Sequence, residues 1–334
     1  MSLPIYQHPT MTVLVDDSVS FLHSLRFQLG PALPSTTFSD AGAALAWLRE
    51  NSRDGSDLES FLSPCIDTYT HEPTPFSVAL RVGQLSQIAR RARRFMTPSA
   101  LVIDYSMPQM NGIEFCEAVK DLPCKKILLT GVADEKVAIA AFNRGLIDRY
   151  IRKSDPDALD RLEADLVALQ REYFLAQSRV VHGLLSLHEY RFVGDPAIAA
   201  LVDQVGRAYQ IVEYYLYKSP SGFLMFDAEG RPHLLVIETE QGMRAHFEIA
   251  CDNNAPPALL DALRERRVIP NFSGGDGDGM YSKAFDAGWY NHTAPAQECR
   301  GRERYYWAMF DLDPAQLDGP VAPLSAFLRR HQAS

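Results

Sequence analysis

Polar residues able to carry out phosphoryl-transfer chemistry stand at the ends of short apolar runs in the first half of the sequence. Two adjacent aspartates follow Met11–Val15, and later runs are followed by a third aspartate, a threonine and a lysine: Asp16, Asp17, Asp104, Thr130 and Lys153. Three carboxylates packed together repel one another unless a cation lies among them. A hard divalent ion such as Mg²⁺ would relieve that repulsion and leave room for a phosphoryl group. One carboxylate could then act as a nucleophile, with the lysine neutralising the transferred oxygens.

These side chains can meet only if the apolar runs are neighbouring parallel strands. Strand-sized runs alternate with helical patterns, which predicts a doubly wound α/β fold with a five-stranded parallel sheet. The expected strands cover residues 11–15, 36–39, 100–103, 126–129 and 149–152. In the strand order 2-1-3-4-5, the carboxyl ends of these strands bring all five residues to one edge of the sheet.

One long insertion interrupts this alternation. Almost fifty residues, about 51–97, separate the second helix from the third strand, where about 2–6 residues are usual. We expect a polar loop over 51–73 and an inserted helix over 75–96. The basic run Arg90-Arg91-Ala92-Arg93-Arg94 is interpreted as a solvated helix face. The alternatives are steering of a kinase, folding over the acidic pocket and contact with an anionic partner.

The pattern changes in the second half of the chain. We predict a helix over 195–217, a hairpin of strands 222–226 and 233–239, a strand over 245–250, a helix over 257–267 and a strand over 305–310. The glycine-rich segment 271–279 is expected to be a polar loop. The expected organisation is a first domain over 1–175 that contains the insertion, and an α+β second domain over 176–334. A leucine stripe after Asp155 fits either burial against the first domain or a dimerising helix.

Four short motifs, each at a strand end and in the right order, carry a resemblance to a known family. They are VDDS at 15–18, IDYSMPQMNG at 103–112, LLTG at 128–131 and YIRK at 150–153. Together they resemble the CheY-like receiver domain of two-component response regulators, which has a flavodoxin-like fold. The resemblance covers residues 11 to about 175 apart from the insertion. One difference is Ser154, which stands where the family commonly has a proline and a cis peptide.

The resemblance implies a role for each matching residue. Asp104 matches the phosphoacceptor, and Asp16 and Asp17 match the pair that holds Mg²⁺. The remaining roles are a metal-binding backbone carbonyl, the switch hydroxyl, the aromatic switch and the phosphate-pairing lysine; they fall on Ser106, Thr130, Tyr150 and Lys153. The implied partner is a sensor histidine kinase or a phosphotransfer protein.

Composition limits the function of the second domain. The chain has a net charge of −9, and the part from Arg191 onward has 14 Lys and Arg against 19 Asp and Glu, a net of −5. Nucleic-acid binding is therefore disfavoured. A protein-interaction or dimerisation module is preferred, so a downstream protein partner or a homodimer is expected. An enzyme regulated by the receiver is the alternative, and a DNA-binding transcription factor is less favoured.

The cysteines and the hydropathy pattern predict where the protein is found. The five cysteines form no C-x-x-C pair, which disfavours a disulfide framework or a zinc site. The apolar runs are too short to span a membrane. A cytoplasmic protein with no membrane partner is therefore expected.

Overall fold

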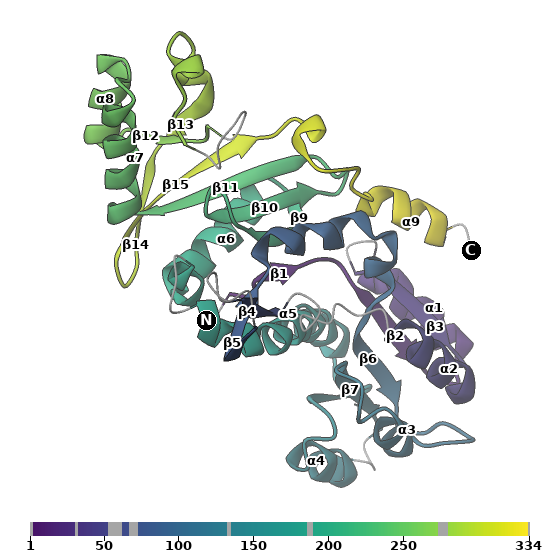
Figure 1. The fold of residues 1–334 in the computed structure, drawn as a ribbon. Helices are drawn as coiled ribbons and strands as arrows, with labels where there is room; N and C mark the ends of the chain where they lie inside the picture. Colours follow the sequence, from purple (N-terminus) through teal and green to yellow (C-terminus); the bar gives the residue numbers. More distant parts are fainter. Residues whose placement is uncertain are drawn as a thin grey trace. The chain divides into compact units, whose positions relative to one another are not determined.

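The computed structural model describes residues 3–30, 33–52, 62–66, 73–131, 135–185, 190–272 and 280–332 (Figure 1). The chain divides into two compact units, each built from separate stretches of sequence. The parallel-sheet unit comprises His8–Asp57, Arg91–Gln177 and Leu324–Ser334. The antiparallel-sheet unit comprises Met1–Gln7, Leu58–Arg90 and Ser178–Pro323.

The parallel-sheet unit has the five-stranded sheet expected from the sequence. The strand order is β3-β2-β6-β7-β8, and neighbouring strands are parallel. The strands are β2 (Met11–Val15), β3 (Ser35–Phe38), β6 (Pro98–Asp104), β7 (Lys125–Thr130) and β8 (Arg149–Arg152). Because β2 lies between β3 and β6, the strand order reverses there, and the predicted doubly wound fold is confirmed.

Helices cover both faces of this sheet. They are α1 (Val19–Leu29), α2 (Ala41–Asn51), α3 (Gly112–Ala118), α4 (Glu135–Asn143) and α5 (Ala158–Leu185). Successive strand residues point to opposite faces. Val13 and Val15 therefore pack in the core formed with α2, α3 and α4, while Leu14 packs with α1 and α5. The leucine stripe of α5 is buried in this second core at Leu162, Leu166 and Leu169, so burial accounts for these leucines.

Side-chain caps set where the helices next to the sheet edge begin. The Ser18 hydroxyl accepts a hydrogen bond from the backbone N–H of Phe21, at the start of α1. Asn111 caps α3 by accepting from two backbone N–H groups, and the Glu114 carboxylate accepts from the N–H of Asn111. This reciprocal capping box fixes the start of the helix that follows the β6 loop.

The antiparallel-sheet unit is built on six strands in the order β1-β9-β10-β11-β15-β14. The strands are β1 (Tyr6–Gln7), β9 (Ile211–Tyr217), β10 (Gly222–Asp227), β11 (Pro232–Thr239), β14 (Gln297–Arg300) and β15 (Arg304–Asp311). The predicted hairpin is β10–β11, and the predicted last strand is β15. Helices α7 (Glu240–Asp252) and α8 (Pro257–Arg264) pack against each other beside this sheet (Figure 1). The pair β12 (Val268–Pro270) and β13 (Thr293–Pro295) completes the predicted α+β architecture.

Two elements expected in this unit are wrong. The helix expected over 195–217 is instead α6 (Pro196–Ala208) followed by β9, because the chain turns at Gln210, where φ is 54°. The strand expected over 245–250 lies inside α7, because the Thr239 hydroxyl caps that helix at the N–H of Gly242. A short apolar run does not by itself distinguish a strand from a buried helix segment.

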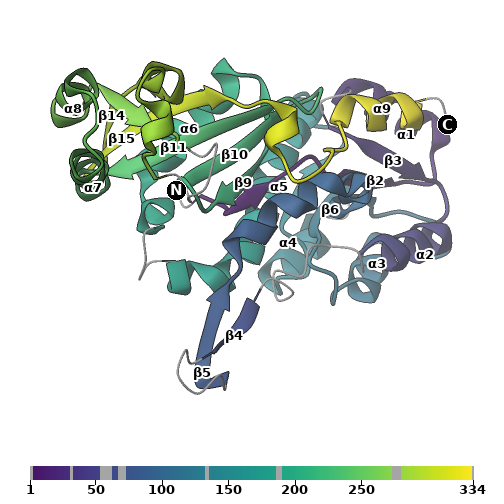
Figure 2. The ribbon, with the colours of Figure 1, turned by 45° about the horizontal axis from the view of Figure 1, so that its top comes forward.

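The insertion also differs from expectation. Residues expected to be loop and helix form an antiparallel ribbon of β4 (Leu62–Ile66) and β5 (Pro73–Leu80), which runs into the 3₁₀ helix η2 (Val82–Arg90), as Figure 2 shows. A second 3₁₀ helix, η3 (Ala92–Met96), follows. The basic run is not one solvated face: Arg90 pairs with Asp318 at 3.3 Å, and Arg94 is buried.

The two compact units do not follow the expected boundaries. The ribbon and η2 belong to the antiparallel-sheet unit, where Ala322 donates its N–H to the Ala89 carbonyl at 3.1 Å. Helix α9 (Leu324–Gln332), expected in the second domain, belongs to the parallel-sheet unit, where Phe327 packs on Phe95 with ring centroids 5.1 Å apart. The boundary near residue 175 falls between Gln177 and Ser178.

Three further observations bear on the expectations. Among the described residues, the cis peptide is at Ser219–Pro220 and not after Lys153. The glycine-rich stretch 273–279 lies outside the described residues. Across the described parts of the chain, no helix is both long enough and apolar enough to cross a membrane.

Candidate functional site

The carboxyl edge of the parallel sheet carries the predicted polar residues. Asp16 follows β2, Asp104 ends β6, Thr130 ends β7 and Lys153 follows β8. The strands are paired in register, with Asp104 opposite Leu129 and Thr130 opposite Arg152. Their ends therefore lie side by side, as the sequence predicted.

Three carboxylates gather at this edge. Asp16, Asp17 and Asp104 each offer an oxygen, and these oxygens lie within 4.8 Å of one another. Asp16 and Asp104 are buried, with 2% and 6% of their surface exposed, while Asp17 is exposed. Each buried carboxylate accepts a backbone hydrogen bond: Asp16 from Ser18 at 2.9 Å and Asp104 from Ser106 at 3.0 Å. The loop that follows each strand thus holds one oxygen of the buried carboxylate at the end of that strand.

Lys153 places a positive charge between the two buried carboxylates. Its Nζ lies 2.6 Å from Oδ2 of Asp16 and 2.8 Å from Oδ1 of Asp104. Burial alone would lower the pKa of Lys153, but the hydrogen bonds and charges of Asp104 and Asp16 outweigh it and raise the pKa. Lys153 is therefore an ammonium ion at neutral pH. The ring of Phe21 lies below it, 4.4 Å from Nζ to the centroid, and further stabilises the cation.

Thr130 has a buried hydroxyl beside the carboxylates. The residue has no exposed surface, and its Oγ1 has no hydrogen-bond partner among the described residues. Its carbonyl accepts the backbone N–H of Lys153 at 3.0 Å, which ties the ends of β7 and β8 together. A buried hydroxyl without a partner is energetically costly and needs an explanation. An incoming oxygen-rich group would supply the missing acceptor.

The remaining predicted residues flank this cluster. Tyr150 lies on β8 and is half-buried against the core formed with α2, α3 and α4. Ser106 is exposed in the loop after β6, and its N–H holds Asp104. The metal-binding role of the Ser106 carbonyl and the switch role of Tyr150 stay predictions.

Two contributors were not predicted from the sequence. Phe21 carries no signal beyond its place in an amphipathic helix. Gly112 is the last residue of the IDYSMPQMNG motif, and a Cβ there would lie 2.5 Å from the Asp104 carbonyl oxygen and 2.7 Å from Cδ1 of Leu128. Only glycine allows the loop to return this close to the end of β6.

The donor set fits a hard divalent cation. Three carboxylates from two strand ends supply oxygen ligands of the type that Mg²⁺ prefers, and the exposed Asp17 leaves one side open to water. Within the described residues, this is the one group of three or more His, Cys, Asp or Glu side chains that comes this close together.

Comparisons with known proteins agree with this geometry. No protein-family model matches the chain. Over 76 residues it is 34% identical to the cyclic di-GMP phosphodiesterase response regulator RpfG of Xanthomonas campestris pv. campestris (strain 8004). This match covers 22% of the chain and about a fifth, 20%, of the curated relative.

The doubly wound sheet and its acidic edge define a receiver domain, and the chain belongs to the response regulators of two-component systems. A solved structure similar to nearly the whole chain is the response regulator LqsR of Legionella pneumophila. The two are 31% identical, with a TM-score of 0.77, and the match covers 98% of this chain and 97% of that one. The likeness therefore extends through both compact units.

Proposed function

We propose that Asp104 accepts a phosphoryl group and that this modification switches the antiparallel-sheet unit. The observation that carries the proposal is the ammonium of Lys153, which lies 2.6 Å and 2.8 Å from the carboxylates of Asp16 and Asp104. The positive charge of Lys153 offsets the charge of the two buried carboxylates, so a negatively charged phosphoryl group can be accommodated at this edge. The phosphoryl donor would be a sensor histidine kinase or a phosphotransfer protein in the cytoplasm.

The transfer can be written from the residues present. An oxygen of the Asp104 carboxylate attacks the phosphorus of a phosphohistidine, an O–P bond forms, and the P–N bond breaks. The departing imidazole nitrogen takes up a proton. Lys153 then pairs with an oxygen of the acquired group. Mg²⁺, held by Asp16, Asp17, Asp104 and the Ser106 carbonyl, would neutralise negative charge on the transferred oxygens.

Thr130 and Tyr150 are proposed to convert this chemistry into a change of shape. The buried Oγ1 of Thr130 has no partner among the described residues, so it gains a hydrogen bond by turning toward a phosphoryl oxygen. The half-buried ring of Tyr150 can then move inward into the space that Thr130 vacates. A shift of a few kcal/mol between two such states is enough to redistribute their populations.

Intact-mass measurement tests the phosphorylation. The full chain is incubated with Mg²⁺ and acetyl phosphate, and we expect the mass to rise by one phosphoryl group. Asp104→Asn should abolish the increase, and EDTA should suppress it. Asp121→Asn, which changes an exposed aspartate of the same unit, is the matched control and should behave as the unmodified chain. No adduct, or an undiminished adduct in Asp104→Asn, would refute the proposal.

The same samples test the output. Light scattering before and after phosphorylation shows whether the chain forms a homodimer in response. If phosphorylation does not change the assembly state, the proposed downstream partner is a different protein and not a second copy of this chain.

A further inference from the structure

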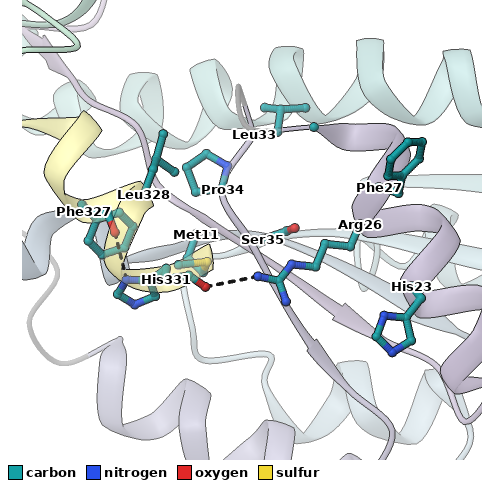
Figure 3. Close-up of a pocket in the computed structure, with 11 residues that line it drawn as sticks. Met11, His23, Arg26, Phe27, Leu33, Pro34, Ser35, Phe327, Leu328 and His331 are labelled. Carbon is teal, nitrogen blue, oxygen red and sulfur yellow. Dashed lines mark hydrogen bonds between the residues drawn. The ribbon is translucent and has the colours of Figure 1, made fainter. Parts of the chain in front are cut away.

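A cavity of about 540 Å³ opens at the other end of the parallel sheet, where β2 and β3 begin (Figure 3). Met11, the first residue of β2, and Ser35, the first of β3, lie at its base together with Leu33 and Pro34. Asp16 follows the last residue of β2, so the five-residue strand separates this cavity from the acidic edge. At about 3.3 Å per residue, the separation is about 17 Å.

Two helices from opposite ends of the chain form the walls. One wall is α1, with His23, Arg26 and Phe27, and the other is α9, with Phe327, Leu328 and His331. Figure 3 shows the Arg26 side chain reaching across toward α9. Its Nη2 donates to the His331 carbonyl at 3.3 Å. A guanidinium has five N–H donors, so Arg26 retains donors for a bound molecule.

The lining of the cavity includes no acidic side chain. The segments that form its walls and most of its base, residues 18–39 and 324–334, contain no Asp or Glu, although the chain as a whole has a net charge of −9. The last turn of α9 adds Arg329, Arg330 and His331. A concave site lined by one sign of charge attracts ions of the opposite sign.

The lining is also apolar and aromatic. Phe27 has 90% of its surface exposed, and Phe327 stacks on His331 with ring centroids 4.0 Å apart. Met11, Leu33 and Pro34 form an apolar base. A volume of about 540 Å³ falls within the range of about 300–1,000 Å³ typical of small-molecule sites. The combination suits a molecule with a charged group and an apolar body better than a simple ion.

We propose that this cavity binds a small organic anion, in which a carboxylate or phosphate is attached to an apolar or aromatic body. Arg26 meets the anionic group, and Phe27 and Phe327 cover the body. The concave shape, closed on two sides by helices, favours a small molecule over an extended polyanion. The site would give the receiver a second input, and it does not depend on the phosphorylation of Asp104.

Isothermal titration calorimetry of the full-length chain tests this proposal. The probes are AMP, which joins an aromatic body to a phosphate, and octanoate, which joins an aliphatic body to a carboxylate. Inorganic phosphate and adenosine supply the charge alone and the body alone. We expect AMP or octanoate to bind at least about tenfold more tightly than both of these controls, because only they use both parts of the site. Which of the two binds identifies the kind of body.

Variants on the exposed face of α1 locate the binding. Arg26→Gln should weaken binding at least about tenfold, and Phe27→Ala should weaken it severalfold. Both side chains are exposed, so neither change removes core packing. Arg49→Gln removes an exposed arginine from α2 and is the matched control, with unchanged affinity expected.

Four results would overturn the proposal. The first is no binding of AMP or octanoate up to about 1 mM, and the second is equal binding of inorganic phosphate alone. The third is binding that Arg26→Gln leaves unchanged. A short DNA duplex that binds more tightly than either probe, with a steep dependence on salt and no effect of Phe27→Ala, would show a polyanion surface instead.

Discussion

The ammonium of Lys153 lies 2.8 Å from Oδ1 of Asp104, although the two residues come from β8 and β6, which β7 separates. The same ammonium lies 2.6 Å from Asp16. Lys153, which follows β8, thus bridges to the ends of β2 and β6, neither of which is hydrogen-bonded to β8. This arrangement holds the acidic edge together before any phosphoryl group arrives.

Replacing Lys153 by glutamine should destabilise the chain. The change leaves two buried carboxylates without their shared cation, and we expect the free energy of unfolding to fall by about 1–3 kcal/mol. Urea denaturation at pH 7 in EDTA measures the effect. Lys120→Gln, at an exposed lysine, should cost less than about 0.5 kcal/mol. Equal losses in the two variants would contradict a stabilising role for Lys153.

Replacing Thr130 by valine should not destabilise the fold. Its hydroxyl is buried with no partner among the described residues, so an isosteric methyl group removes a cost of about 1–3 kcal/mol or leaves stability unchanged. Thr12→Val is the contrast: the Thr12 hydroxyl accepts from Gln170 at 3.3 Å, and we expect a loss of about 1 kcal/mol. Thermal unfolding of both variants decides this. A clear loss of stability in Thr130→Val would reveal a hidden partner.

Thr130→Val also separates phosphorylation from switching. We expect the variant to gain the mass of a phosphoryl group, because its carboxylates are intact. Hydrogen exchange across β8 should then no longer respond to phosphorylation, since the hydroxyl that follows the phosphoryl group is gone. An unchanged response in the variant would remove Thr130 from the proposed switch.

Alanine at Gly112 should disturb the phosphoacceptor loop. A Cβ there would lie 2.5 Å from the Asp104 carbonyl oxygen, so the loop must move, at a cost of about 1–3 kcal/mol. Phosphoryl uptake from acetyl phosphate should fall together with stability. Gly206→Ala, in the last turn of α6 with nothing within 4 Å of the added carbon, should instead stabilise by about 0.5–1 kcal/mol.

His8 should make the chain sensitive to mild acid. Burial lowers its pKa to about 3; the hydrogen bond with Pro9 opposes this shift, and the charge of Arg94 adds to it. The unfolded chain binds a proton at His8 below about pH 6.5, whereas the folded chain does not bind one until near pH 3. Stability therefore falls as pH drops through this window, by up to about 1.4 kcal/mol per pH unit.

Urea titrations between pH 7 and pH 4 measure that slope. His8→Gln does not titrate and should show a shallower decline, whereas His23→Gln, at an exposed histidine, should retain the full slope. Identical slopes for the original chain and His8→Gln would rule out His8 as the cause.

Asp195 should be a major support of the antiparallel-sheet unit. Its buried carboxylate accepts from the N–H groups of Ala197 at 2.9 Å and Arg302 at 2.6 Å, which links the start of α6 to the β14–β15 turn. We expect Asp195→Ala to cost about 2–3 kcal/mol in thermal unfolding. Asp313→Ala, at the exposed cap of a short 3₁₀ helix, should cost less than about 1 kcal/mol.

The acidic edge could be predicted from the sequence because its signals are local. Each polar residue of the site stands at the end of a run of buried strand residues. Parallel pairing of neighbouring strands is enough to bring these ends together. The site therefore depended only on recognising four short runs, such as Met11–Val15. The same logic correctly paired β10 with β11, where a short turn joins two apolar runs.

Other features depend on contacts between distant residues. The packing of Phe327 against Phe95 places α9 in the parallel-sheet unit, and no sequence pattern near either residue predicts this contact. Within the insertion, Val82, Leu85 and Ala89 are buried, but their backbone is 3₁₀ where an α-helix was expected, and a strand precedes it. Segment 245–250 is helical because α7 begins at a cap formed by Thr239. That residue lies outside the apolar run that suggested a strand.

The interleaved composition of the two units decides how the protein can be dissected. A fragment that stops at Gln177 keeps the receiver motifs but loses α9, and with it the ring that covers Phe95 and one wall of the cavity. The complementary fragment lacks β1, which pairs with β9, and the segment whose Ala89 binds Ala322. A single cut therefore leaves neither unit complete.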